Sequence, residues 1–253
     1  MVGVSKMYKL TLRANVLMLE GNTRTLKLAE SHNLRRIPYG GQHIDSSRNH
    51  LNTELVQLGS LSLHDKVLSI VRSKGIDTNH YSLKKKNRGY GVEFVFSVTD
   101  GFVCDFYSLY TDCIDWLKDY YPESEVAHAV IHFDEKTPHL HVVLVPIVNG
   151  TLQADKVRDF KKANIRAMSL FEYLDPSYGL SIPAFLKGAA KKTGAEKAIT
   201  IYRALPDEKI RSMLDPAIIQ AIHARPEPFM VGMGMSLRVA YYGEHGNSNI
   251  KES

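Results

Sequence analysis

The chain has 253 residues, enough for one large domain or for one domain with a smaller appendage. Hydrophobic residues make up 44% and charged residues 23%, which is typical of a folded protein and excludes a predominantly disordered chain. The formal net charge of +5 suits a polyanionic partner, but an excess this small does not establish one.

The first half of the chain contains patterns of both strands and helices. Alternating apolar residues predict strands, and apolar residues three or four apart predict helices. The predicted strands are residues 8–18 and 91–98. The predicted helices are residues 23–31, with Asn22 as the N-cap, residues 51–73, with a break at Gly59, and residues 105–121.

The second half begins with two strongly apolar strands. They are predicted at residues 126–133 and 140–148, joined by a polar link, with a helix at 155–174. Residues 182–198 are basic and rich in alanine, residues 207–222 have a helical pattern, and no period is evident after Pro226. This order predicts an α+β fold with a central antiparallel sheet and helices on one side. We expect one domain at 1–180 and an appendage at 181–253.

Three histidines stand out because they lie on the two apolar strands. His139 and His141 are two residues apart, so a strand turns both side chains to one face. His132 ends the preceding strand, and a short hairpin would bring it opposite the other two. Solvent exposure or separate hydrogen bonds would account for one such histidine. Three together favour a metal site, because one ion supplies a partner to every buried imidazole.

The ligand types leave the identity of the metal open. Three nitrogens without cysteine suit zinc, manganese, cobalt or nickel. The chain has no His-Glu-x-x-His helix, which argues against a zincin protease. It also lacks the Cys-x-x-Cys pair of the nucleobase deaminases. A coordination position left for water or substrate would make the site catalytic rather than structural.

Two sequence blocks resemble the motifs of one protein family. The block from His32 to Asn52 contains His-Asn-x-Arg and then Ile-Asp-x-x-Arg-x-x-x-Asn. The block from His132 to His141 is His-x-Asp-Glu-x-x-Pro-His-x-His. Together they resemble the Mob/Pre family of plasmid mobilisation and recombination proteins, the MobV-type relaxases. The resemblance extends over about residues 5–175, although the family's short proline-containing middle motif is not evident.

This resemblance implies an HUH-type endonuclease that nicks and rejoins single-stranded DNA at an origin of transfer. It implies that His132, His139 and His141 bind a divalent metal ion, which we expect to be Mn²⁺ or Mg²⁺. It further implies that His32 is the nucleophile and forms a phosphohistidine with the 5′ end of the cut strand. Glu135 would activate or orient His32.

Further residues are candidates for supporting or DNA-contacting roles. The resemblance implies such roles for Arg35, Asp45, Arg48 and Asn52. The basic run before the strand at 91–98 would either grip phosphates of the incoming strand or form a solvated turn. This run contains Lys84, Lys85, Lys86 and Arg88.

Some roles within the site have competing candidates. Tyr8, Tyr39 and Tyr81 are rival nucleophiles, because many other relaxases use tyrosine, and Tyr39 is the nearest of the three to His32 in sequence. Asp134 either orients a ligand histidine or is simply a turn residue of the hairpin.

The cellular setting follows from what the chain lacks. Its start has no apolar core long enough for a signal peptide, and no run reaches the roughly 18–20 apolar residues of a spanning helix. With only Cys104 and Cys113, we expect a cytoplasmic protein without a membrane partner. The expected partners are single-stranded DNA, a coupling protein and transfer machinery. The alternatives are a rolling-circle initiator or transposase of this fold, and a non-catalytic DNA-binding relative.

Overall fold

The computed structural model describes residues 8–36, 43–76, 89–181, 183–206 and 216–242. The chain divides into two compact units. The first, here called the sheet unit, comprises residues 1–163 and 176–180. The second, the helical unit, comprises residues 164–175 and 181–253.

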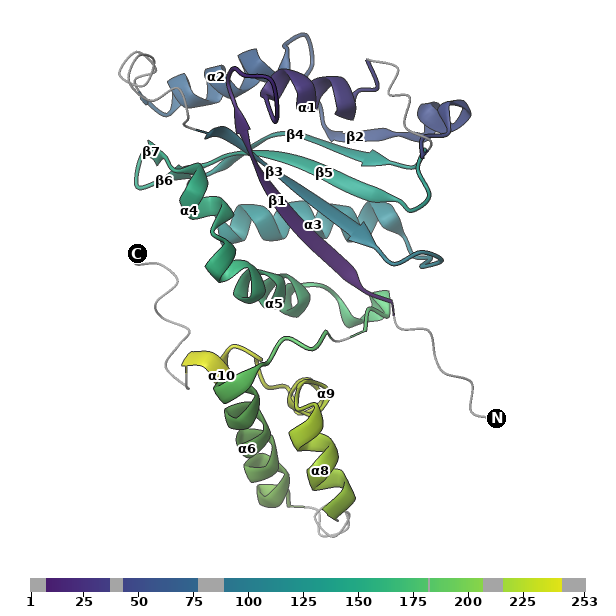
Figure 1. Ribbon diagram of the computed structural model, residues 1–253, viewed down its shortest axis with the longest axis vertical. Helices are drawn as coiled ribbons and strands as arrows, with labels where there is room; N and C mark the ends of the chain where they lie inside the picture. The colour runs from purple at the N-terminus through teal and green to yellow at the C-terminus, as the bar shows by residue number, and fades with distance from the viewer. Residues whose placement is uncertain (1–7, 37–42, 77–88, 182, 207–215, 243–253) are drawn as a thin grey trace. The chain divides into compact units, whose positions relative to one another are not determined.

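A five-stranded antiparallel sheet forms the centre of the sheet unit (Figure 1). Its spatial order is β1-β3-β5-β4-β2, so β5 and β4 lie inside the sheet and β1 and β2 form its edges. The strands are β1 (Leu10–Met18), β2 (Thr53–Val56), β3 (Gly89–Val98), β4 (Glu125–His132) and β5 (His139–Val145). A two-stranded hairpin follows, formed by β6 (Ile147–Val148) and β7 (Thr151–Leu152).

Helices cover both faces of this sheet (Figure 1). On one face, α3 (Phe106–Tyr120) packs Trp116 edge-on against Phe96 of β3. On the other face, α1 (Leu26–Asn33) and α2 (Leu63–Ser73) form an apolar core with the sheet, in which Val143 and Val145 of β5 are fully buried. The prediction of an α+β fold with a central antiparallel sheet is confirmed. The prediction that the helices lie on one side is wrong.

The remaining short elements of the sheet unit connect the main ones. They are the 3₁₀ turns η1 (Ser46–Leu51), η2 (Phe160–Lys162) and η3 (Pro176–Tyr178), and the helix α4 (Ala154–Arg158). The helix predicted for residues 155–174 is thus broken into α4, η2 and α5 (Ala163–Tyr173). Asp159 causes the first break, because its φ of −15° and ψ of 107° are not helical and its carboxylate caps η2.

The helical unit has its own apolar core. Met168 of α5, Ala195 and Ala198 of α6 and Met230 of α9 are completely or almost completely buried in it. The helices that follow α5 are α6 (Gly188–Ala204), α8 (Pro216–Ala224), α9 (Glu227–Gly232) and α10 (Val239–Tyr242). Glu227 is buried and accepts a hydrogen bond from the backbone N–H of Leu186 (2.8 Å).

Two predictions for the first half of the chain are wrong in detail. The helix predicted for residues 23–31 is α1, which begins at Leu26 and is capped by Thr25 rather than Asn22. Residues 53–56 form strand β2 instead of helix, because they pair with β4 at the edge of the sheet. No helix within the described ranges has the length and apolar character needed to cross a lipid bilayer.

Candidate metal and DNA-cleavage site

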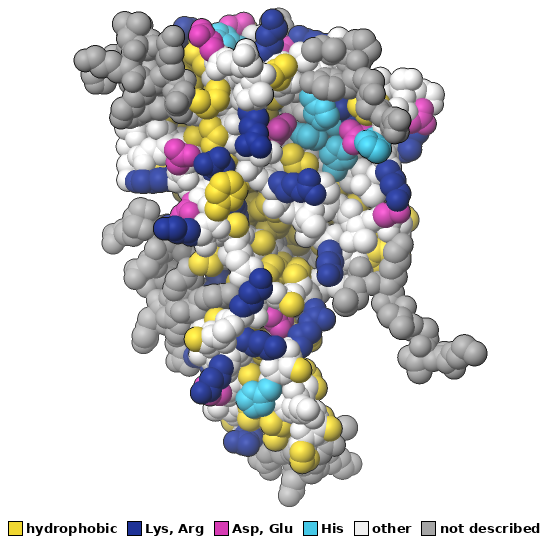
Figure 2. Space-filling view, viewed as in Figure 1, with side chains coloured by type: hydrophobic (Ala, Val, Ile, Leu, Met, Phe, Trp, Pro, Cys, Tyr) yellow, Lys and Arg dark blue, Asp and Glu magenta, His cyan; other side chains and the backbone are white. Residues whose placement is uncertain are grey.

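Three predicted metal ligands meet on the face of the sheet that carries α1 and α2. His132 of β4 lies directly opposite His139 of β5, and His141 follows on the same face. The ring centroids are 5.2 Å apart for His132 and His139, 4.8 Å for His132 and His141, and 5.0 Å for His139 and His141. Figure 2 shows a group of histidine side chains at the surface of the sheet unit.

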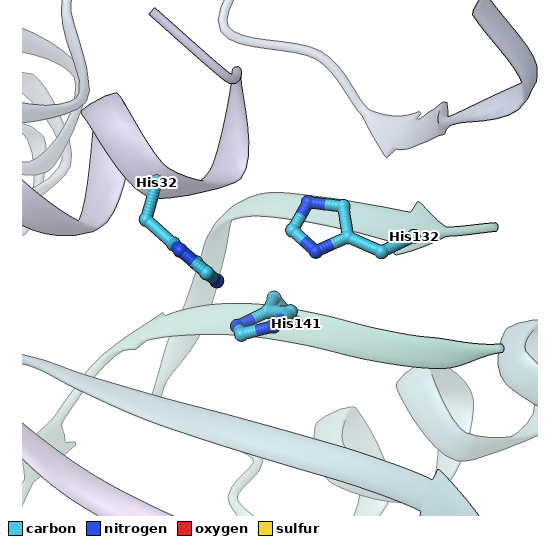
Figure 3. Close-up of side chains that lie close together, drawn as sticks. All are labelled: His32, His132 and His141. Carbon is cyan, nitrogen blue, oxygen red and sulfur yellow. The ribbon is translucent and has the colours of Figure 1, made fainter. Parts of the chain in front are cut away.

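His32 joins this cluster from the last turn of α1. Its ring centroid is 5.1 Å from that of His141 and 5.4 Å from that of His132. These three side chains point toward one another from a helix and two strands (Figure 3). One ligand atom from each lies within 4.8 Å of the others, and so do ligand atoms of His132, Glu135 and His139.

Each of the three strand histidines uses one ring nitrogen to bind a fixed oxygen. His132 Nε2 donates to the carbonyl of Asn33 (3.0 Å), and His139 Nδ1 donates to the carbonyl of Thr137 (2.9 Å). His141 Nδ1 donates to Oε1 of Glu93 (3.0 Å). These bonds fix the tautomers, so the second nitrogen of each ring keeps its lone pair, which is the usual arrangement of metal-binding histidines.

The second nitrogen of His132 shows that this donor set fits a metal ion. His132 Nδ1 is fully buried and has no hydrogen-bond partner. A buried polar atom without a partner costs about 1–3 kcal/mol. Because this atom points into a group of further imidazole lone pairs, a divalent ion would satisfy it where no donor of the chain does.

His32 lies beside a cation. Its Nδ1 lies 3.5 Å from Nη1 of Arg35, a cationic donor rather than an acceptor. The Arg35 guanidinium also donates to the His32 carbonyl (3.2 Å). The guanidinium beside its ring distinguishes His32 from the three strand histidines, each of which donates to a carbonyl or carboxylate oxygen.

Burial favours the neutral imidazoles of His32, His132 and His141. It lowers the pKa of His132 to about 2, with a further contribution from the neighbouring His141. The pKa of His141 is also lowered, first by burial and then by His139 and His32. Burial, followed by the charge of Arg35, lowers the pKa of His32. Neutral rings are required both of metal ligands and of a nitrogen nucleophile.

Asp134 holds the two motif-bearing segments together. Its carboxylate is fully buried and accepts hydrogen bonds from Nε and Nη2 of Arg35 (both 2.8 Å) and from Nδ2 of Asn52 (2.7 Å). Although burial alone would raise the pKa of Asp134, these donors lower it to about 2. The Asp134 carbonyl also accepts from the backbone N–H of Asp45 (2.7 Å). Asp134 therefore anchors the motif segments rather than acting as a simple turn residue.

Glu135 is paired with Arg35 in the structure. Its Oε1 accepts from Nη2 of Arg35 (2.8 Å) and lies 3.8 Å from Nε2 of His139. Arg35 thus lies between the carboxylate of Glu135 and the ring of His32, and it takes up a left-handed backbone conformation (φ 52°) to do so. The arrangement brings a carboxylate, a guanidinium and four imidazoles into one cluster.

The remaining residues predicted for the site, including the rival tyrosines, lie in different parts of the chain. Arg35 and Asn52 are engaged with Asp134, as described above. Asp45 caps η1 by accepting from the N–H of Ser47 (3.1 Å), and Arg48 is exposed on the same turn. Tyr8 lies beside Phe102. Outside the described residues are Tyr39, Tyr81, Lys84, Lys85, Lys86 and Arg88.

Glu93 is a part of the site that the sequence interpretation missed. It lies on β3, is mostly buried with 14% of its side chain exposed, and accepts the bond from His141. Burial raises the pKa of Glu93. The nearby ring of His32 opposes this shift but does not reverse it. A signal was present in the sequence, because Glu93 is the one carboxylate in an otherwise apolar or small-residue strand, on the face opposite Val92 and Phe94.

The family model described as plasmid recombination enzyme, Mob/Pre, matches residues 20–172. A plasmid recombination enzyme of Streptococcus agalactiae is 27% identical over 202 residues, which are 74% of this chain and 37% of that protein. One of Bacillus sp is 27% identical over 151 residues, which are 57% of this chain and 35% of that protein. The chain therefore spans less than half the length of these curated relatives.

Solved structures of the MobM relaxase domain share the fold. A Mn-bound crystal structure of that domain with plasmid oriT DNA has a TM-score of 0.57 and 25% identity, covering 69% of this chain and 88% of that chain. A second such complex has a TM-score of 0.58 at 24% identity. The resemblance inferred from the two motifs is confirmed. Since the family model matches more than half of the residues, the chain belongs to the Mob/Pre family of plasmid recombination enzymes.

Proposed function

We propose that this protein is a relaxase, a metal-dependent enzyme that nicks one DNA strand at an origin of transfer and can rejoin it. The observation that carries the proposal is the convergence of four imidazoles, three of them held by oxygen acceptors and one beside a guanidinium. The family membership and the MobM domains crystallised with oriT DNA support it.

We propose His132, His139 and His141 as the ligands of a divalent ion, with Mn²⁺ or Mg²⁺ as the native metal. The MobM domains bound to Mn support this choice. Such an ion would polarise the scissile phosphate and stabilise the negative charge that develops on its oxygens. The neutral state of the buried rings preserves the full charge of the ion.

His32 is the proposed nucleophile. A neutral ring nitrogen of His32 forms a bond to phosphorus, the bond from phosphorus to the 3′ oxygen breaks, and that oxygen leaves and takes up a proton. The 5′ end of the strand is then held as a phosphohistidine, and the other ring nitrogen gives up its proton to a carboxylate or to solvent. Attack by the 3′ hydroxyl reverses every step, so joining needs no ATP.

Glu135 and Arg35 would control the charge of His32 during this step. Arg35 helps to keep the ring neutral before attack, because its cation disfavours protonation. The ring becomes acidic as its nitrogen bonds phosphorus, and Glu135 is the nearby carboxylate proposed to accept the proton. The ion pair between Glu135 and Arg35 (2.8 Å) holds that carboxylate beside the cluster.

The remaining parts of the proposal concern partners and organisation. We place the reaction in residues 1–180 and treat residues 181–253 as an appendage, although α5 packs with the helices of the latter. Arg48 is proposed to contact DNA, with Arg35, Asp45 and Asn52 supporting the site. The protein would act in the cytoplasm with a coupling protein and transfer machinery. Its two cysteines, both free thiols, suit that reducing compartment.

A covalent adduct tests the proposal directly. The protein is incubated with a pool of single-stranded oligonucleotides and Mn²⁺, and a protein–DNA adduct is sought on a denaturing gel. The expected adduct is lost with EDTA and in His32→Ala, but it persists in His64→Ala, which removes a partly exposed histidine of α2 outside the cluster. A wild-type protein that binds DNA without forming the adduct would be a non-catalytic relative. An adduct that survives in His32→Ala and disappears in Tyr39→Phe would move the nucleophile.

A further inference from the structure

Helices α1 and α2 cover only part of the sheet face that carries the histidines. Beyond Val143 and Val145 of β5 it is sealed by the apolar core with α1 and α2. On the β1 side of the sheet, Thr11 and Arg13 of this edge strand and Lys9, which directly precedes it, alternate onto the same face and are exposed. The histidines lie where the apolar cover ends and this open part begins.

Two rows of cross-strand residue pairs run from the exposed β1 residues to the proposed ligands. Thr11 pairs with Ser97 of β3, and Ser97 pairs with His139. Arg13 pairs with Val95, which pairs with His141. Neighbouring strands are about 4.8 Å apart, so the β1 residues of these rows are about 10 Å from the ligands across the sheet. An arginine side chain can cover much of that distance.

The charge of the open part is positive. Lys9 and Arg13 form no ion pair with any residue that the structure describes. Two acidic side chains, one on β3 and one just after it, are otherwise engaged, because Glu93 accepts from His141 (3.0 Å) and Asp100 pairs with Lys136 (3.0 Å). These two cations lie on the same sheet face as the proposed cleavage site, and their charge is complementary to that of a nucleic-acid backbone.

Resting on the proposed function, we propose that Lys9, Thr11 and Arg13 form a phosphate-binding strip for the single-stranded DNA that enters the histidine cluster. Arg13 offers two parallel N–H donors to a phosphate, Lys9 offers a point charge, and Thr11 offers a hydroxyl. The half-buried Val95, between Arg13 and His141, provides an apolar contact for a sugar or base. The strip positions the substrate and touches no reacting atom.

A matched pair of double variants tests the strip. Lys9→Gln with Arg13→Gln removes its two charges. Arg72→Gln with Lys118→Gln removes two exposed charges from α2 and α3, and so keeps the same net charge. Binding of a fluorescein-labelled polythymidine strand is measured by anisotropy in EDTA over a range of salt concentrations. Thermal melting checks that both variants are folded.

The strip variant is expected to bind about tenfold more weakly than the control, and its slope of log K against log salt to be shallower by about 1.4, or about 0.7 for each lost phosphate contact. Equal weakening of both variants would overturn the proposal, since only net charge would then matter. At saturating DNA, the strip variant should form the covalent adduct at the wild-type rate.

The two proposals can fail separately. If wild type forms no adduct, yet the strip variant binds DNA more weakly than its control, the relaxase reaction is wrong and the strip stands. If wild type forms the adduct and the two double variants bind DNA alike, the strip is wrong and the reaction stands.

Discussion

His128 is a buried histidine of β4 outside the proposed ligand set. Its side chain is completely inaccessible, and its Nδ1 donates to the carbonyl of Val56 (3.0 Å) and lies 3.5 Å from the carboxylate of Glu54. Burial lowers the pKa of His128, and the opposing charges of Glu54, Glu30 and Glu93 do not reverse the shift. The folded protein therefore holds this ring in its neutral form.

This shift predicts a loss of stability in mild acid. The unfolded chain takes up a proton at His128 near its ordinary pKa of about 6.5, whereas the folded chain does so only at lower pH. The contribution of His128 to the unfolding free energy is thus complete above about pH 6.5 and declines as the pH falls below that value. His128→Gln keeps a donor for Val56 but cannot titrate.

Urea unfolding in EDTA between pH 7.5 and 5 measures this effect. The unfolding free energy of His128→Gln should fall less with decreasing pH than that of wild type. Parallel curves for wild type and His128→Gln would show that His128 carries none of the pH dependence.

At the scale of elements, α1 determines where His32 lies. The helix begins with a side-chain cap, in which Thr25 Oγ1 accepts from the N–H of Leu28 (3.2 Å). Glu30, buried in the middle of α1, accepts from the N–H of Leu63 (2.8 Å) and so fastens α1 to the start of α2. The carbonyl of Asn33 at its end holds His132. One short helix thus joins the proposed nucleophile to a proposed ligand.

The N-cap of α1 should be measurable as stability. Removing a threonine cap costs about 1 kcal/mol, because one N–H of the first turn loses its acceptor. Thr25→Ala should therefore lower the unfolding free energy by about 1 kcal/mol. Thr25→Ser, which keeps the hydroxyl, should retain most of it. Urea denaturation compares the three proteins, and equal losses in both variants would assign the effect to the lost methyl group instead.

The elements that were predictable from sequence are those with a strong local pattern. The apolar strands β4 and β5 and the amphipathic helix α3 were located to within a few residues. Strand β2 was not, because Leu55 and Leu58 have helical spacing, and only pairing with β4 makes residues 53–56 extended. Asn22 and Thr25 are both suitable caps, and the sequence does not choose between them.

The site was predictable where its residues are close in sequence. His132, His139 and His141 lie on one hairpin, so local geometry brings them together. The motif placed His32 with them only by family resemblance. The contact of Glu93 with His141 depends on the pairing of β3 with β5, which joins residues 48 positions apart. Long-range pairing of that kind has no local signature.

At the scale of the whole molecule, the two units are each supported by their own core. In the helical unit, Glu172 connects α5 to residues 236–238, which precede α10. Its carboxylate accepts from Ser236 Oγ (2.8 Å), from the N–H of Leu237 (2.6 Å) and from Nε of Arg238 (2.9 Å). Three bonds to one half-buried carboxylate make this a fixed point of the unit.

Glu172→Gln therefore tests whether the units are independent. Replacing the carboxylate weakens charge-assisted bonds worth about 1.5–3 kcal/mol each, so the helical unit should melt at lower temperature. Calorimetry should detect this shift, while Mn²⁺ affinity by titration calorimetry stays at the wild-type value. Glu196→Gln, at an exposed position of α6, serves as the control. A matching loss of Mn²⁺ affinity in Glu172→Gln would contradict independence.

The order of strands places the proposed metal ligands and the proposed phosphate-binding strip on different strands, so either set can change by mutation without the other. The proposed metal ligands lie on β4 and β5, each of which is hydrogen-bonded to a neighbouring strand on both sides and is therefore costly to alter. Edge strand β1 has a neighbour on one side only, and its outward residues Thr11 and Arg13 contribute little to packing. Because phosphate contacts carry no sequence information, exchanges along that margin would change how tightly single-stranded DNA is held rather than which sequence is recognised, and the proposed reaction centre would stay as it is.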